Sequence, residues 1–102
     1  MTERAAPVVE VEAWLAHLIP TFLANRLKDA DRLRRALRER DFDAIRALGH
    51  NLRGAAGGYG FAALAEVGER IEAAAIAGDA DGAAACSDEL AAYARTVKVV
   101  YR

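Results

Sequence analysis

The sequence has little cysteine, proline or aromatic character, and almost no net charge. Its 102 residues include one cysteine, two prolines and 7% aromatic residues, and 14 Lys and Arg nearly balance 15 Asp and Glu. The lone Cys86 excludes an internal disulfide and is expected to be a small buried hydrophobe. A formal charge of −1 provides no basic field to attract nucleic acid or an anionic membrane surface. No apolar run approaches the ~20 residues that a membrane span needs.

The length and the composition favour one small helical domain. A chain of 102 residues forms a single domain, 1–102, which can bury one core but not a deep substrate cleft as well. The hydrophobic fraction of 54% is largely alanine, which suits close-packed helices better than strands. The first residues, MTERAAPVVEVEAW, are acidic where a signal peptide would be apolar, so we expect a cytoplasmic protein.

Apolar residues recur at spacings of three and four along most of the chain, which indicates amphipathic helices. A short helix is expected over about 8–18, and Pro20 either starts or kinks the long helix that follows. Asp41 is expected to cap the next helix, which Gly58 or Gly60 would end in a left-handed turn. Two further helices are expected over about 61–77 and 80–100.

Short connections between long helices favour antiparallel neighbours. We therefore predict an all-α fold, an antiparallel up-down four-helix bundle over about 19–101. An additional short N-terminal helix would lie across one end of this bundle, within about residues 1–18. The arginine-rich polar face of the first long helix is interspersed with acidic residues and is expected to be solvated.

The third expected helix contains the stretch GHNLRGAAGGYG, residues 49–60. Successive helical residues turn by about 100°, so His50 lies about 160° from Leu52, the centre of the apolar stripe. We therefore expect the imidazole to face water. Gly54 and Gly57 share its half of the helix and leave the neighbouring surface nearly bare of side chains. Glycine inside a helix costs about 1 kcal/mol relative to alanine, and close approach of a large partner is one reason to tolerate this cost.

Other interpretations of this stretch fit less well. An exposed histidine on a helix most often has no special role. The glycines lack the Gly-Lys-Ser/Thr ending of a phosphate-binding loop, and no expected strand precedes them. His17 and His50 are the only histidines, and neither has a ligand pair at helical spacing, so we expect no metal site.

At these residues the sequence resembles the histidine-containing phosphotransfer (HPt) domains of multistep two-component signalling. The family signature is a histidine, then a lysine or similar base three positions on, glycine at four and another glycine at ten. Here these positions are His50, Arg53, Gly54 and Gly60. Arginine stands where lysine is commoner, and it keeps the positive charge. The resemblance covers roughly residues 18–93.

The resemblance implies a phosphocarrier without kinase activity of its own. His50 would accept a phosphoryl group from the phospho-aspartate of a receiver domain and pass it to another receiver. Arg53 and Arg46 would supply positive charge to the phosphoryl oxygens or orient the partner, and Gly54 and Gly57 would leave clearance for docking. A solvent-exposed imidazole is largely unprotonated at neutral pH, so no activating base is required. No acidic residue lies three or four positions from this histidine.

The partners implied by the resemblance are response-regulator receiver domains and a hybrid histidine kinase. No cofactor is expected in the chain itself, because Mg²⁺ would be bound by the receiver, and we expect a monomer. The alternative function is an interaction-only helical bundle, either a receiver-binding adaptor or an inactive phosphotransfer domain. The joint presence of His50, Arg53 and Gly54 argues against that alternative.

Overall fold

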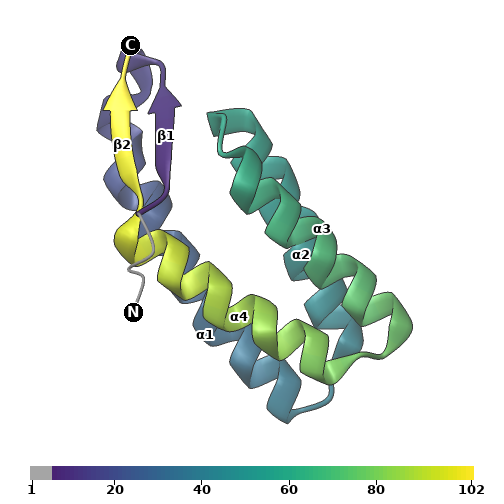
Figure 1. Ribbon diagram of the computed structural model, residues 1–102. Helices are drawn as coiled ribbons and strands as arrows, with labels where there is room; N and C mark the ends of the chain where they lie inside the picture. Colours follow the sequence, from purple (N-terminus) through teal and green to yellow (C-terminus); the bar gives the residue numbers. More distant parts are fainter. Residues whose placement is uncertain (1–5) are drawn as a thin grey trace.

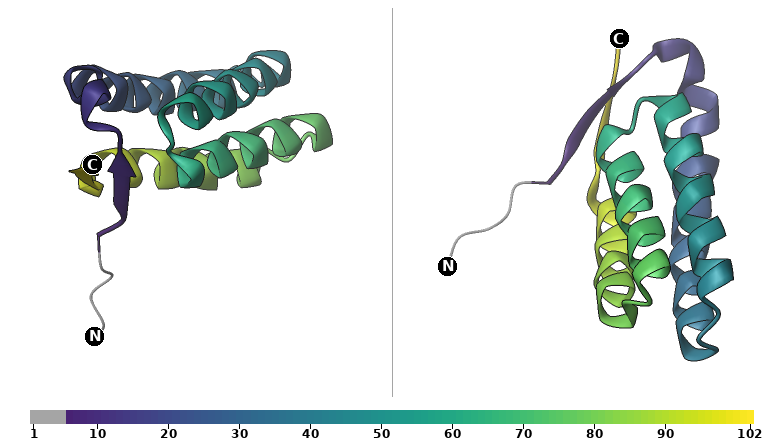
Figure 2. Two further views of the ribbon diagram at one scale, coloured as in Figure 1. Left: turned by 90° about the horizontal axis from the view of Figure 1, so that it is seen from above. Right: turned by 90° about the vertical axis from the view of Figure 1, so that its right-hand side faces the viewer.

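The computed structural model describes residues 6–102 and consists mainly of four helices. Successive helices reverse direction, so the predicted up-down four-helix bundle is confirmed (Figure 1). The bundle is two helices deep, with α1 and α2 in one layer and α3 and α4 in the other (Figure 2). No helix in this part of the chain is both long and apolar enough to cross a bilayer. The four helices are α1 (Ile19–Arg38), α2 (Phe42–Tyr59), α3 (Ala62–Ala77) and α4 (Ala80–Thr96).

The helix ends follow local sequence signals. Pro20 lies in the first turn of α1, where its missing N–H costs no helical hydrogen bond. The Asp41 carboxylate caps α2 by accepting a hydrogen bond of 3.0 Å from the amide of Ala44, as predicted. Gly60 closes α2 with φ of 83°, a conformation that glycine adopts without strain. The turn role expected of Gly58 is wrong, because this residue lies inside α2.

Both ends of the described chain differ from the predicted helices. Val8–Val11 forms strand β1, which pairs in parallel with strand β2, Lys98–Tyr101. Of the helix expected over 8–18, only Ala13–Leu18 is helical, as the 3₁₀ helix η1, and α4 ends four residues before 100. The segments VVEV and KVVY are rich in β-branched residues, which favour strands. They can pair with each other only because the fold brings the two segments together.

The core is apolar and joins all four helices. The rings of Phe22 in α1 and Phe61 at the start of α3 stack with centroids 4.9 Å apart. Cys86 is also buried, as predicted, and this burial raises the pKa of its thiol. Side chains that are fully shielded from solvent include Leu33, Ile45, Phe61, Leu64, Ile71 and Leu90.

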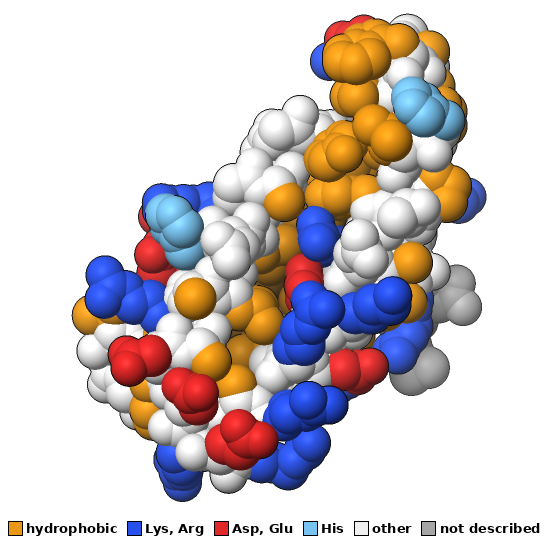
Figure 3. All heavy atoms as spheres, turned by 180° about the vertical axis from the view of Figure 1, so that it is seen from behind, with side chains coloured by type: hydrophobic (Ala, Val, Ile, Leu, Met, Phe, Trp, Pro, Cys, Tyr) orange, Lys and Arg blue, Asp and Glu red, His pale blue; other side chains and the backbone are white. Residues whose placement is uncertain are grey.

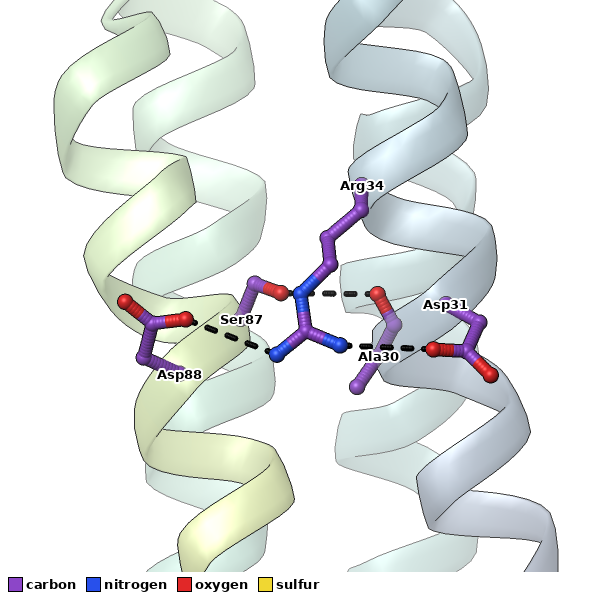
Figure 4. Close-up of polar contacts among 5 residues, drawn as sticks. All are labelled: Ala30, Asp31, Arg34, Ser87 and Asp88. Carbon is purple, nitrogen blue, oxygen red and sulfur yellow. Dashed lines mark hydrogen bonds and ion pairs between the residues drawn. The ribbon is translucent and has the colours of Figure 1, made fainter.

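Polar contacts tie α1 to α4 across the layers (Figure 4). The buried hydroxyl of Ser87 donates to the carbonyl of Ala30 at 3.4 Å. At the adjacent surface, the Arg34 guanidinium lies 3.3 Å from Asp31 in α1 and 3.4 Å from Asp88 in α4. Exposed ion pairs contribute little to stability, so the two Arg34 contacts add little to the packing of α1 against α4.

Candidate functional site

His50 lies in the middle of α2 with its imidazole directed to solvent. The side chain is 63% exposed, whereas Leu52 on the opposite side of the helix is buried. This confirms the orientation expected from the helical periodicity. The exposed ring is therefore accessible to another macromolecule.

A carboxylate from the neighbouring helix stands beside this imidazole. Glu72 of α3 places Oε2 at 3.4 Å from Nδ1 of His50 and Oε1 at 3.5 Å from Nη1 of Arg53. Its side chain is only 18% exposed, so the carboxylate is held against the helix pair. The sequence contains no acid three or four positions from His50, and Glu72 was missed because it lies 22 positions further along the chain.

Two glycines explain why α3 comes so close. A Cβ atom added at Gly49 would lie 2.6 Å from the amide nitrogen of Glu72 and 2.7 Å from the carbonyl oxygen of Gly68. One added at Gly68 would lie 2.7 Å from the amide nitrogen of Arg53. The backbones of α2 and α3 are thus in direct contact at these two glycines. A side chain at either position would prevent this contact. The pair Gly49 and Gly68 was the sequence signal that could have located Glu72.

A shallow hollow of about 300 Å³ surrounds the imidazole. Arg46, one turn before His50, is among its lining residues, so the structure brings this predicted residue to the histidine. Arg53 lies outside this hollow and is joined to the histidine through Glu72. The residues that line the hollow are Asp43, Arg46, Ala47, His50, Asn51 and Glu72.

A second hollow lies along α2 and the start of α3. Arg53, Gly57 and Gly60 line it on the α2 side, and two acidic residues of α3, Glu66 and Glu69, line it on the other. Gly57 therefore belongs to this second hollow and not to the one around His50. In residues 6–102, no group of three His, Cys, Asp or Glu side chains is placed to hold a metal ion.

Internal packing does not require glycine at the exposed positions of α2. Added Cβ atoms at Gly54, Gly57 and Gly58 would meet no other atom within 4 Å. These glycines lower helix stability without a compensating close contact inside the chain. Residues that disfavour the local secondary structure, such as these glycines in a helix, are often found at functional surfaces.

Replacing Gly54 by alanine should therefore stabilise the bundle by up to about 1 kcal/mol, since alanine is the better helix former. If the bare surface serves a docking partner, the same variant should weaken binding of that partner. Urea unfolding and calorimetric binding measure the two effects. Gly58→Ala is the control, expected to give the same stabilisation. Unchanged binding by Gly54→Ala would show that clearance at this position is not needed.

The fold and the site together define a helical bundle with an exposed histidine on α2 and a carboxylate of α3 beside it. The histidine lies in a shallow hollow of the surface and not in a deep cleft.

The family model of the Hpt domain matches residues 17–98, and the chain belongs to this family. Hpt domains carry out histidine phosphotransfer in two-component phosphorelays, in which they interact with receiver domains and histidine kinases. No significant match to the chain is found among curated proteins or among solved structures.

Proposed function

We propose that this chain relays a phosphoryl group between aspartates of receiver domains, with His50 as the phosphoacceptor. The observation that carries the proposal is the position of this imidazole, 63% exposed at the middle of α2 inside the region of the family match. The bare surface at Gly54 gives a second protein room to approach the ring.

The proposed reaction transfers the phosphoryl group directly between side chains. The lone pair on Nε2 of His50 attacks the phosphorus of a receiver aspartyl phosphate. An N–P bond forms, the P–O bond breaks, and the aspartate leaves as a carboxylate. The reverse reaction phosphorylates the aspartate of the next receiver. Such transfer depends mainly on positioning and charge stabilisation, and Mg²⁺ bound by the receiver would neutralise the phosphoryl oxygens.

Glu72 has a specific part in this proposal. Because its carboxylate faces Nδ1, it favours the tautomer with the proton on Nδ1 and leaves the lone pair of Nε2 free for attack. When Nε2 is phosphorylated and Nδ1 keeps its proton, the ring becomes positively charged, and the same carboxylate would stabilise that charge. Glu72 is a positioning residue, since it acts through the imidazole.

The two predicted arginines would act on the phosphoryl group or on the partner. Arg46 lines the hollow around His50 and can direct its guanidinium to phosphoryl oxygens entering there. Arg53 is held by Glu72, and its side chain is 46% exposed. It is therefore available to the receiver at the rim of the contact.

The proposal is tested by incubating the chain with a receiver domain carrying a radiolabelled aspartyl phosphate. We expect label to move to the chain in a form that is labile in acid and stable in base, as a phosphorylated imidazole is and an acyl phosphate is not. Failure to acquire label from any of a panel of phosphorylated receivers, with binding retained, would favour the interaction-only alternative. Base-labile label would place the phosphoryl group on another type of side chain.

Replacing Glu72 by glutamine should slow transfer roughly tenfold, the effect of losing about 1.4 kcal/mol of transition-state stabilisation. The isosteric amide keeps the packing but removes the negative charge beside Nδ1. The rate is measured from single-turnover transfer to a receiver. The matched control is Glu69→Gln, which removes an exposed charge one turn earlier in α3. Equal rates in the two variants would show that Glu72 does not position the imidazole.

A further inference from the structure

A groove of about 520 Å³ runs between α1 and α2 on the face shown in Figure 3. In this view apolar side chains lie inside the hollow, with clustered charged side chains on one wall and a histidine beyond the other. Most of the groove is apolar, but α1 contributes three charged residues to it. The lining residues are Arg26, Asp29, Arg32, Ala36, Ala44, Ala47, Leu48, Asn51, Leu52 and Ala55.

Arg26 is the unusual residue of this groove. Its side chain is only 11% exposed, and its guanidinium carbon lies 4.5 Å from the centre of the Phe22 ring. Nε is 2.9 Å from Oδ2 of Asp29 as an ion pair, whereas Nη1 has no hydrogen-bond acceptor among the described residues. Buried donors without acceptors are costly, so a protein that keeps one needs a reason.

The charge in the groove is also incompletely balanced. Asp29 is shared by two arginines, because Nη1 of Arg32 lies 3.4 Å from its second oxygen. Two guanidinium groups and one carboxylate leave a net positive charge against an apolar wall. The rest of this segment is also positively charged, since residues 19–40 include seven Lys or Arg and three Asp or Glu. The complementary ligand is a carboxylate with apolar neighbours.

The groove is continuous with the site of the proposed reaction. Ala47 and Asn51 of α2 line both the groove and the hollow around His50. A protein surface that covers the imidazole and extends across these two residues therefore reaches the groove.

We propose that Arg26 anchors the receiver partner by binding the carboxylate of an Asp or Glu side chain that enters this groove between apolar residues of that partner. The inference rests on the proposed function, because the partner is the receiver that exchanges phosphoryl groups with His50. Arg26 contributes to affinity and partner choice, and it takes no part in the chemical step. Nη1, which has no acceptor among the described residues, acquires one only in the complex.

The test compares Arg26→Met with Arg35→Met, an exposed arginine of the same helix that does not line the groove. Affinity is measured calorimetrically with a receiver that phosphorylates the parent chain. We expect Arg26→Met to raise Kd about tenfold and Arg35→Met to change it less than about twofold. Because the guanidinium is incompletely paired in the free chain, Arg26→Met should keep or raise the unfolding temperature.

A double-mutant cycle then identifies the acceptor. Each carboxylate on the receiver's docking surface is replaced by its amide, and one replacement should weaken binding to the parent but not to Arg26→Met. Equal affinity of Arg26→Met and the parent, a fall in its unfolding temperature, or the lack of any coupled carboxylate would overturn the inference. These results leave the labelling of His50 unaffected. A chain that no receiver labels would instead overturn the proposed function, and the inference with it.

Discussion

Glutamine in place of His50 is expected to eliminate transferable phosphoryl label, with a loss of more than about a hundredfold. Glutamine has a similar length and polarity but no ring nitrogen that can form an N–P bond. Because the side chain is 63% exposed, the substitution should change the free energy of unfolding by less than about 0.5 kcal/mol. Label is counted after denaturing electrophoresis and exposure to acid or base.

The matched control for this experiment is His17→Gln. His17 is the only other histidine and is exposed in η1, away from α2. We expect this variant to be labelled as fast as the parent. Label that persists in His50→Gln, or that disappears in His17→Gln, would contradict the assignment of the phosphoacceptor.

Alanine at Gly68 is expected to lower the free energy of unfolding by about 3 kcal/mol, in the range of severe overpacking. The new Cβ would lie 2.7 Å from the carbonyl oxygen of Gly49 and from the amide nitrogen of Arg53. Both atoms belong to the backbone of a helix, so neither can rotate away. The helices α2 and α3 must separate, and Glu72 should then move from His50.

This loss is measured by urea unfolding monitored by circular dichroism, with Gly58→Ala as the control. Gly58 is also helical, but a Cβ there meets nothing within 4 Å, so alanine should be stabilising, as at Gly54. Equal stability of Gly68→Ala and the parent would show that the backbone contact between α2 and α3 is not tight in solution. If Gly68→Ala folds but transfers the phosphoryl group slowly, the spacing of α2 and α3 is needed to hold Glu72 beside His50.

The local pattern of the sequence was enough to predict the four helices of the bundle and the position of the exposed histidine. Helix periodicity and capping depend on residues within one or two turns, so Asp41 could be recognised directly and the helix end could be narrowed to Gly58 or Gly60. The same periodicity determines that His50 faces away from Leu52. These features need no knowledge of which helices are neighbours.

Only the tertiary structure decided what stands around the histidine. Glu72 reaches it because two glycines let α2 and α3 touch, and Arg26 is buried because α1 packs beside α2. The pairing of β1 with β2 likewise joins segments from opposite ends of the described chain. Such contacts depend on the packing of distant segments, whereas periodicity in a sequence reports only the faces of each segment.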